Sequence, residues 1–254
     1  MNDAAGRVML VAGGSGSIGS AIAADALAAG WTVAVHGRSA ASAAAVVARV
    51  RGDADAEVEA FAADFTDAGA IEALVARAGA WRGRLDAVVD CTSMGPPRRL
   101  TGAFADTEPE GYAALLDQSV GNCQRLAHAA LPWLRRDGGT LIAFASDAGR
   151  YAAPRQAIIG ASRAAIIGFV RNLSTEVARD GVRVHCISPS FVDDTDSARR
   201  LAAINAERIA HLRQRAGLGL PTPADLAPLV LFLCSDAARR MTGQVLSING
   251  GANA

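Results

Sequence analysis

Short runs of branched apolar residues alternate with longer alanine-rich segments along almost the whole chain. We expect the apolar runs to form strands, at residues 8–12, 32–36, 58–62, 86–91, 140–145, 183–188 and 244–248. The alanine-rich segments have a helical pattern, near residues 17–29, 39–51, 67–80, 107–136, 155–179 and 223–235. Short apolar strands that alternate with helices predict an α/β fold: a doubly wound parallel sheet of about seven strands with helices on both faces.

Two segments interrupt this alternation. Residues 92–106 are rich in Gly and Pro, and residues 193–219 are polar with clusters of basic residues. We interpret both as loops, which in an open α/β sheet gather at the carboxyl edge of the strands, where ligands bind. The second loop is a candidate lid over a substrate. Thr107 and Glu110 have the spacing of a capping box, with Thr107 as the N-cap of the long helix that follows.

The length and net charge of the chain limit the number of domains and the kinds of partner that we expect. At 254 residues the chain fits one α/β domain over residues 1–254. Its 25 basic and 25 acidic residues give a formal net charge of zero, so we expect no nucleic acid or membrane surface as a partner. The apolar run 226–234 contains Pro228 and is far too short to span a membrane. We therefore expect a cytoplasmic protein that acts on a small molecule.

The cysteines and histidines do not have the spacing of a metal site. The cysteines stand far apart without a C-x-x-C pair, each in an apolar stretch, and the histidines are equally scattered. We expect no metal ion at these residues: Cys91, Cys123, Cys186, Cys234, His36, His128, His185 and His211.

A glycine-rich turn follows the first predicted strand. The segment Ala12-Gly13-Gly14-Ser15-Gly16-Ser17-Ile18-Gly19 leads directly into the first helical stretch and contains G-x-G-x-x-G. A strand, a glycine turn and a helix N-terminus in this order place backbone N–H groups against a pyrophosphate. This predicts a Rossmann-type dinucleotide site, to which the segment contributes Gly13, Ser15, Gly16, Ile18 and Gly19.

The second predicted strand indicates which dinucleotide is bound. An acidic residue at its end would accept a hydrogen bond from the ribose 2′-hydroxyl of NAD, but none lies between Trp31 and Gly52. Arg38 stands there instead, and its planar, permanently charged guanidinium suits the 2′-phosphate of NADP. We expect NADP(H) as the cofactor.

The segment from Ser146 to Arg163 resembles the active-site segment of the short-chain dehydrogenase/reductase family. In that family a serine lies thirteen residues before the tyrosine of a Tyr-x-x-x-Lys motif; here Ser146 is followed at that spacing by Ile159, and four residues later by Arg163. The resemblance covers nearly the whole chain, including a closing strand at residues 242–251. The glycine turn departs from the family's T-G-x-x-x-G-x-G pattern, because Ala12 replaces the threonine and Ser17 the middle glycine.

The resemblance implies further positions that contact the cofactor. Asp64 and Phe65 match the acidic and apolar pair that family members place beside the adenine. The loop after the fourth strand, Asn-Asn-Ala-Gly in most members, begins here with Asp90 and Cys91, and the Pro-Gly after the sixth strand reads Pro189-Ser190. The family pattern thereby adds cofactor-binding positions at Asp64, Phe65, Asp90, Arg163, Pro189 and Val192.

The residues that carry the family's chemistry are mostly replaced. The resemblance assigns the proton donor to the tyrosine position, ribose binding to the lysine, substrate orientation to the serine and support of a relay water to an asparagine. Only Ser146 remains; Ile159 has no proton to give, Arg163 does not deprotonate in proteins, and Ser119 takes the asparagine position. Loss of a positioned acid removes roughly 10²–10⁴ in rate, so the family's ordinary mechanism is disabled.

Three residues are candidates for a replacement proton donor. Tyr151 lies five residues after Ser146 and forms Y-x-x-x-R with Arg155, but on a loop broken by Pro154. It is a candidate catalytic residue together with Ser146 and Arg163, and the alternative is an aromatic wall of the pocket. Asp147 and Asp90 lie near the same edge, and each would need a raised pKa to act as an acid.

Three functions are compatible with these residues. We favour an NADP(H)-dependent oxidoreductase with a non-standard active site that acts on a small carbonyl or hydroxyl compound. The alternatives are a catalytically silent subunit that binds NADP and a non-redox enzyme, such as a dehydratase or isomerase, on the same scaffold. Helices 107–136 and 155–179 are apolar around much of their circumference. Their counterparts pair across a two-fold axis in relatives, so we expect a homodimer or homotetramer.

Overall fold

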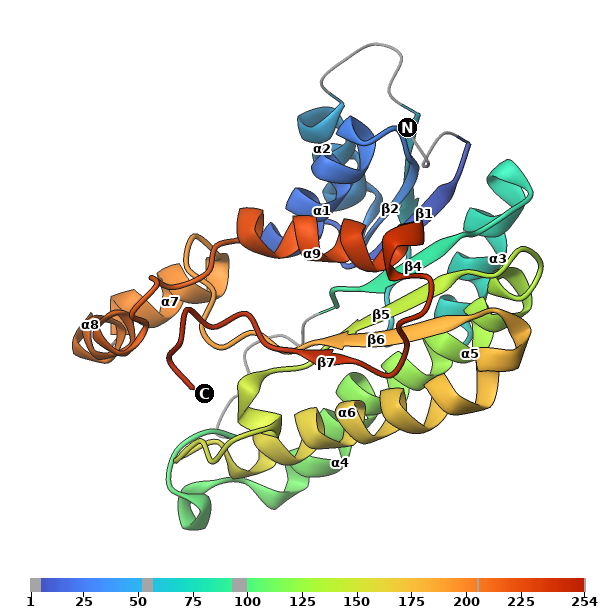
Figure 1. The fold of residues 1–254 in the computed structure, drawn as a ribbon. Helices are drawn as coiled ribbons and strands as arrows, with labels where there is room; N and C mark the ends of the chain where they lie inside the picture. The colour runs from blue at the N-terminus through green and yellow to red at the C-terminus, as the bar shows by residue number, and fades with distance from the viewer. Residues whose placement is uncertain (1–5, 52–56, 93–99, 205, 254) are drawn as a thin grey trace.

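The computed structural model describes residues 6–51, 57–92, 100–204 and 206–253 (Figure 1). These residues form one parallel sheet in the strand order β3-β2-β1-β4-β5-β6-β7, which confirms the predicted doubly wound architecture. The strands are β1 (Val8–Ala12), β2 (Thr32–Gly37), β3 (Val58–Ala62), β4 (Ala87–Asp90), β5 (Thr140–Phe144), β6 (Arg183–Ile187) and β7 (Val245–Leu246).

The strand order reverses between β1 and β4. Leu10 of β1 pairs with Ala34 of β2 on one side and with Val88 of β4 on the other. From this point the chain winds outward in one direction to β3 and in the other to β7. In open parallel sheets, the crevice outside the carboxyl ends of the two strands at such a reversal is the usual place for a ligand.

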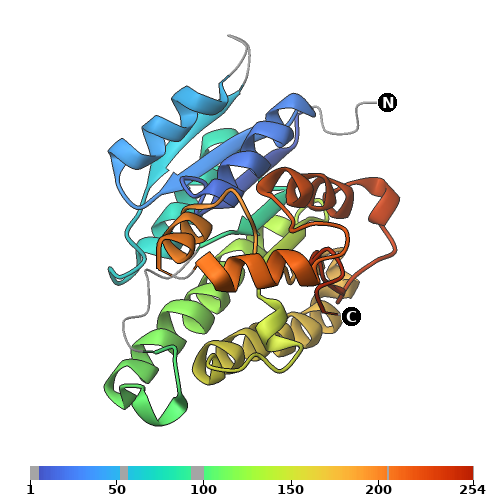
Figure 2. The ribbon, with the colours of Figure 1, turned by 90° about the vertical axis from the view of Figure 1, so that its left-hand side faces the viewer.

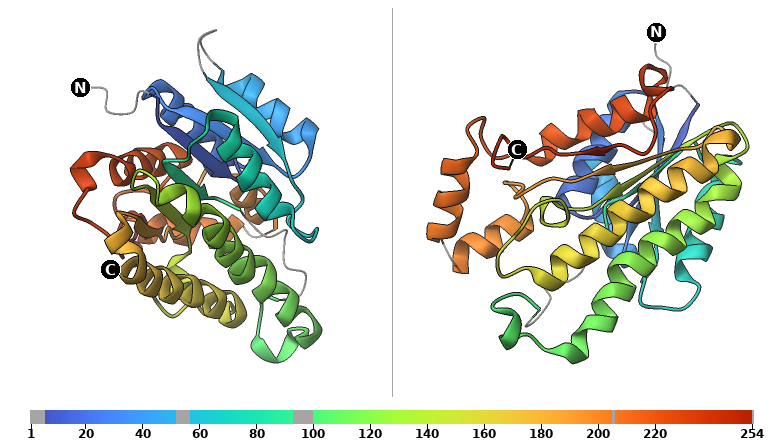
Figure 3. Two further views of the ribbon diagram at one scale, coloured as in Figure 1. Left: turned by 90° about the vertical axis from the view of Figure 1, so that its right-hand side faces the viewer. Right: turned by 60° about the horizontal axis from the view of Figure 1, so that its bottom comes forward.

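Helices cover both faces of the sheet (Figures 1 and 3). One face packs against α1 (Ser17–Ala28), α2 (Ala40–Val50) and α9 (Pro223–Cys234), with Met9 and Val11 in that core. The other packs against α3 (Ala70–Arg82), α5 (Asn122–Leu134) and α6 (Ala157–Val177), with Leu10 and Val88 in that core. Alternate residues of one strand thus enter different cores. No helix in the described ranges is long and apolar enough to cross a membrane.

The segment predicted as a polar loop at residues 193–219 is largely helical. It contains α7 (Asp196–Ile204) and α8 (Ala206–Arg215), which extend beyond the sheet at its carboxyl edge (Figures 1 and 2). Thr195 accepts a hydrogen bond from the N–H of Ala198, so α7 is capped. Ala198 and Ile209 are buried, so each helix has an apolar side. The many charged residues around these positions made the segment look like a loop in the sequence.

The continuous helix predicted at residues 107–136 is interrupted. A 3₁₀ turn (Pro109–Gly111) is followed by the short α4 (Tyr112–Leu116), a π-helical turn (Asp117–Gly121) and then α5. The predicted capping box is wrong: the Thr107 hydroxyl binds the Phe104 carbonyl and the Tyr112 hydroxyl, so Thr107 ends the preceding 3₁₀ turn (Phe104–Asp106). Of the predicted loop 92–106, residues 93–99 lie outside the described part of the chain.

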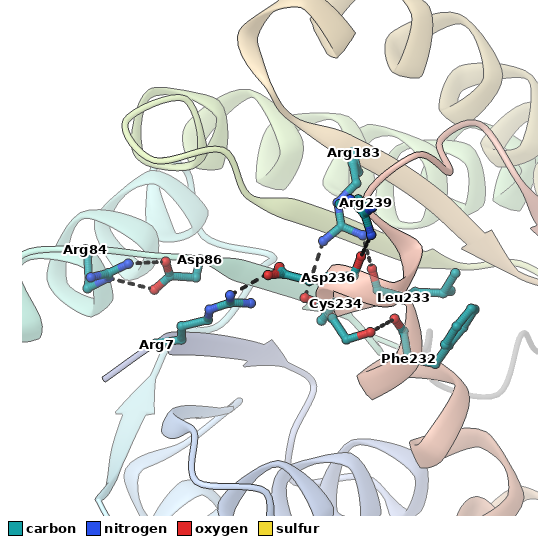
Figure 4. Close-up of polar contacts among 10 residues, drawn as sticks. Arg7, Arg84, Asp86, Arg183, Phe232, Leu233, Cys234, Asp236 and Arg239 are labelled. Carbon is teal, nitrogen blue, oxygen red and sulfur yellow. Dashed lines mark hydrogen bonds and ion pairs between the residues drawn. The ribbon is translucent and has the colours of Figure 1, made fainter. Parts of the chain in front are cut away.

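Charged side chains fasten the strands together at the amino edge of the sheet (Figure 4). The Asp86 carboxylate, just before β4, accepts hydrogen bonds from the N–H of Val8 in β1 and from the Arg84 guanidinium. Arg7, just before β1, pairs with Asp236 beyond the end of α9. This edge is therefore cross-linked by side chains from distant parts of the sequence.

The same edge also closes the end of helix α9. Arg183, the first residue of β6, donates to the carbonyl oxygens of Leu233 and Cys234 (Figure 4). Carbonyl groups in the last turn of a helix have no partner within the helix, and a cation there also interacts favourably with the helix dipole. Arg183 therefore fixes α9 to the start of β6.

Candidate functional site

The glycine-rich turn is held by close contacts between backbone segments. Gly13 has φ +75°, and a Cβ there would lie 2.6 Å from the carbonyl oxygen of Cys91. A Cβ on Gly19 would lie 2.5 Å from the carbonyl oxygen of Gly13. Only glycine fits at both positions, which brings the turn against the end of β4 and the start of α1.

Helix α1 begins directly beneath this turn and presents unpaired donors. Gly16 precedes the helix and has no side chain to cap it. Within the described residues the N–H groups of Ser17, Ile18 and Gly19 have no backbone or side-chain acceptor, and the first helical bond runs from Ser20 to Gly16. Unpaired N–H groups and the positive end of the helix dipole form an anion site, which fits the pyrophosphate of a dinucleotide.

His36 connects the glycine turn to the next strand. Its Nδ1 accepts from the N–H of Gly13 at 2.9 Å, and its Nε2 lies 2.9 Å from the carbonyl oxygen of Ala63. These partners assign the proton to Nε2, and burial lowers the pKa of His36, which keeps the ring neutral. The ring stacks on Phe65 with centroids 4.5 Å apart. Its position at the end of a predicted strand was the one signal in the sequence that could have placed His36 in the site.

A cavity of about 440 Å³ opens beside this turn. Six residues predicted to bind the cofactor line it: Gly13, Ser15, Gly16, Arg38, Asp64 and Phe65. The sequence prediction missed the other lining residues, which are His36, Ser39, Ser42, Ala63, Thr66, Cys91, Thr92, Gln118 and Asn122. The remaining predicted cofactor residues are not among those that line it: Ile18, Gly19, Asp90, Arg163, Pro189 and Val192.

Arg38 and two serines form the outer end of the cavity. Ser39 and Ser42 exchange hydrogen bonds in a reciprocal cap at the start of α2, which fixes both hydroxyls beside Arg38. Across the cavity, the backbone N–H and hydroxyl of Thr66 donate to Asp64. These bonds lower the pKa of Asp64, and the charge of Arg38 lowers it further. The site therefore offers one guanidinium and two hydroxyls for an additional phosphate.

The turn after β5, which begins at Ser146, packs on the helix that carries Arg163. Ser146 follows β5, and its Oγ accepts from the N–H of Ala148 at 3.3 Å. A Cβ on Gly149 would lie 2.6 Å from the carbonyl carbon of Arg163, so this turn packs directly on α6. The contact places the predicted serine beside the helix that carries Ile159 and Arg163.

Arg163 lies in a cluster of buried polar groups. Its Nη1 donates to the Oγ of Ser119 at 3.4 Å, so the structure joins two of the predicted positions. Burial raises the pKa of the nearby Asp90, against the opposing effects of hydrogen bonds from Thr92 and Cys123 and of the Arg163 charge. The half-buried Arg163 therefore has a carboxyl group as its counterpart, in a place where most family members have asparagine.

The three candidate proton donors differ in their surroundings. Tyr151 is half-buried, its N–H donates to the Asp147 carbonyl, and the Arg150 guanidinium lies 5.1 Å from its ring centroid. The carboxylate of Asp147 is fully occupied as an acceptor, with donors from Ser188, Ser247, Asn249 and Asn253. That of Asp90 accepts from Thr92. Within the part of the chain that the structure describes, the Tyr151 hydroxyl has no such acceptor role, and Asp90 is the candidate whose pKa burial raises.

Pro189 and Val192 lie after β6 and support this edge. The carbonyl of Pro189 accepts from the N–H of Asp147, and Val192 is buried against the core that contains α9. The described residues contain no group of three or more His, Cys, Asp or Glu side chains arranged to hold a metal ion.

Comparison with known proteins identifies relatives over most of the chain. The family model described as enoyl-(acyl carrier protein) reductase matches residues 12–253. The short-chain reductase protein NovJ of Streptomyces niveus is 30% identical over 249 residues, which cover 96% of this chain and 93% of NovJ. Some other curated relatives match over only 56% of their own length.

Two further relatives bear on the chemistry. The inactive 2-(S)-hydroxypropyl-CoM dehydrogenase 2 of Xanthobacter autotrophicus is 30% identical over 196 residues, covering 76% of this chain and 84% of that protein. A 7α-hydroxysteroid dehydrogenase in complex with NADH and 7-oxo glycochenodeoxycholic acid has a TM-score of 0.89 and 26% identity. The match covers 98% of this chain and 95% of the dehydrogenase.

Proposed function

The chain belongs to the short-chain dehydrogenase/reductase family, and we propose that it binds NADP(H) and acts as an oxidoreductase on a small carbonyl or hydroxyl compound. The proposal rests chiefly on the unpaired N–H groups of Ser17, Ile18 and Gly19, which directly follow Ser15 and Gly16 in the lining of the cavity that Arg38 also lines. The structural relative that carries NADH supports a nicotinamide cofactor.

The residues present fit such a cofactor. The start of α1 would hold the pyrophosphate, and Phe65 with the adjacent Asp64 would contact the adenine. Arg163 would donate to the hydroxyls of the nicotinamide ribose, because it keeps a charged donor group where the family has lysine. When bound, NADPH supplies the hydride for reduction of a carbonyl group.

The choice of NADP over NAD follows from the charge at the outer end of the cavity. Arg38, Ser39 and Ser42 offer a guanidinium and two hydroxyls to a 2′-phosphate. Asp64 is the carboxylate opposite, but it is occupied by Thr66. These contacts favour the more negatively charged cofactor.

Fluorescence titration tests this choice directly. We expect NADPH to bind at least about tenfold more tightly than NADH, a difference of about 1.4 kcal/mol, and Arg38→Asp to reverse the order. Arg49→Asp makes the same charge change at an exposed position later in α2 and should leave the order intact. Equal affinities, or no binding of either nucleotide, would refute the proposal.

The chemistry at the substrate end depends on Ser146. Its hydroxyl would orient the substrate oxygen, and Arg163 with Ser119 would fix the ribose beside it. Ile159 supplies no proton at the position of the family's tyrosine. Tyr151 is the residue we assign as the replacement donor. Asp147 already accepts hydrogen bonds at both oxygens, and Asp90, although burial raises its pKa, accepts from Thr92 and lies near the charge of Arg163.

A catalytically silent subunit is the second candidate. The observation that favours it is Ile159 itself, together with the existence of a relative described as inactive. In that case the cofactor site would stabilise the protein without turnover. NADPH binding with no oxidation or reduction across a broad carbonyl and alcohol panel would favour this reading over the first. A dehydratase or isomerase would instead turn over without consuming NADPH.

We further propose a homodimer or homotetramer. Ala161, Ala164 and Ala165 lie exposed on α6, where small side chains allow the helix of a second copy to approach closely. Light scattering that shows a stable monomer at micromolar concentration would contradict this.

A further inference from the structure

The Asp147 side chain gathers donors from distant parts of the chain. It is 3% exposed, and its Oδ1 accepts from Ser247 at 2.7 Å and from Ser188 at 3.4 Å. Its Oδ2 accepts from Asn249 Nδ2 at 2.6 Å and from Asn253 Nδ2 at 3.4 Å. A buried carboxylate requires such partners, and here three of the four come from the last residues of the described chain.

These last residues, 247–253, form what we call the C-terminal segment. Asn249 organises it: its Nδ2 also donates to the Asn253 carbonyl, and its Oδ1 accepts from the N–H of Gly251. The orientation of the Asn249 amide is therefore fixed by three partners at once. The NH₂ group of Asn249 must therefore point to residue 147, and the side chain at 147 has to accept its hydrogen bond.

The C-terminal segment in turn holds the end of the lid, residues 193–219. Arg215, the last residue of α8, donates to the carbonyl of Ala252 and to the side chain of Asn253. The N–H of Leu218 donates to the carbonyl of Gly250. The backbones touch here, because a Cβ on Gly250 would lie 1.8 Å from the carbonyl oxygen of Gly219.

The start of the lid is fastened separately. The N–H of Asp196 donates to the Ser17 hydroxyl at 3.3 Å, in the glycine-rich turn. Between its two attachments the lid projects from the carboxyl edge of the sheet, and the chain's C-terminal end lies beside it (Figures 1 and 2). The far attachment thus leads from α8 through the C-terminal segment to Asp147, the residue next to Ser146.

We propose that Asp147 is a positioning residue that connects α7 and α8, through the C-terminal segment, to the turn after β5 that begins at Ser146. This connection, which we call the latch, sets access to the substrate pocket. The statement about access rests on the proposed function, whereas the latch is a property of the fold itself. Both oxygens of this carboxylate serve as acceptors, and an alanine at this position removes both at once.

Hydrogen–deuterium exchange of the free protein tests the latch without nucleotide or turnover. In Asp147→Ala, amides of α7 and α8 should exchange at least about tenfold faster, while those of β1 and β4 remain protected. Asp86→Ala at the amino edge also removes a carboxylate with several donors, and it should not free the lid selectively. Arg215→Ala breaks the chain of contacts on the lid side and should accelerate the same amides, even if Asp147→Ala folds poorly.

The distribution of exchange over the molecule distinguishes a specific contact from general loss of stability. Unchanged lid exchange in Arg215→Ala, or uniform acceleration across the sheet in Asp147→Ala, would overturn the latch. Nucleotide titration measured separately keeps this outcome distinct from the proposed function.

Discussion

The two edges of the same sheet are built in opposite ways. At the amino edge, Asp86 accepts from Arg84 and the Val8 N–H, Arg7 pairs with Asp236, and Arg183 caps the carbonyls of α9 (Figure 4). At the carboxyl edge, the start of α1 leaves the N–H groups of three successive residues without an acceptor in the described chain, next to a cavity. The amino edge pairs these groups with one another, whereas the carboxyl edge pairs some of its polar groups, such as Asp147, and leaves the N–H groups at the start of α1 open for a ligand.

This difference indicates where stability and function reside. A polar group that is already paired within the chain contributes to folding and has little left for a ligand. Unpaired N–H groups at a helix N-terminus do not stabilise the unliganded protein, and they become favourable when an anion binds to them. We therefore expect changes at the carboxyl edge to alter binding or turnover, and changes at the amino edge to alter the free energy of unfolding.

The largest effect is expected at Gly19. A valine there would place its Cβ 2.5 Å from the Gly13 carbonyl oxygen, so the turn would have to move. The N–H groups at the start of α1 would then no longer point toward the pyrophosphate. NADPH affinity should fall by more than about a thousandfold, or about 4 kcal/mol, in calorimetric titration. Gly217→Val, where a Cβ meets no atom within 4 Å, is the matched control and should bind normally. Normal binding by Gly19→Val would disprove the assignment of this turn.

The next effect is a gain at the substrate end of the same edge. In a Tyr151→Phe background, which removes the assigned replacement donor, Ile159→Tyr with Arg163→Lys restores the family's acid and its partner, and should raise reduction of generic ketones by at least about a hundredfold. Ile159→Tyr alone should gain less, because the wider guanidinium of Arg163 remains, bound to Ser119. Adding Ser146→Ala should remove the gain.

An inert double variant that still binds NADPH would show that the pocket does not accept such carbonyl compounds. The silent-subunit or non-redox reading would then replace the oxidoreductase.

At the amino edge, Asp86→Ala should lower stability and leave binding intact. It removes hydrogen bonds to Arg84 and leaves the buried N–H of Val8 without its acceptor. Since Arg84 is partly exposed, we expect a loss of about 2 kcal/mol in the free energy of unfolding, measured by urea denaturation. NADPH affinity of the folded variant should stay within twofold. A large loss of affinity would mean that the two edges are not independent.

The smallest effect concerns pH, through the buried His185 in β6. Burial, assisted by the charge of Arg183 and only partly opposed by a backbone hydrogen bond with Met241, lowers the pKa of His185 to about 4. In the unfolded chain the pKa of His185 is about 6.5, so below that pH the unfolded chain binds a proton that the folded protein does not bind. The free energy of unfolding therefore falls as the pH drops toward 4. Between pH 7.5 and 5.5 this contributes a loss of about 1.4 kcal/mol.

Urea denaturation of the starting protein and of His185→Leu at both pH values isolates this contribution. The variant should lose about 1.4 kcal/mol less than the starting protein over the same interval. Identical losses in the two proteins would exclude His185 as the cause.

The strands and the glycine turn were predicted correctly because the pattern of neighbouring residues identifies them. Every predicted strand is present within a few residues of its expected place, because buried parallel strands are apolar along their whole length and need no distant partner to be recognised. The glycine turn was equally readable, since the positions that need glycine follow one another in the chain. Where local signals conflicted, as with the charged helices α7 and α8 or Pro109 and Gly111 before α4, the prediction was wrong.

The sequence by itself determined the sheet, the placement of the dinucleotide turn and the family, all of which depend on neighbouring residues. Only the tertiary structure decided which polar groups are paired and which remain open. Asp147 looked like a candidate acid in the sequence, but its partner Asn249 is 102 residues away. His36 looked like a scattered histidine, but it holds Gly13 and Ala63 together. Hydrogen bonds form over about 3 Å of space regardless of separation along the chain, so their pairing is set by folding and not by local pattern.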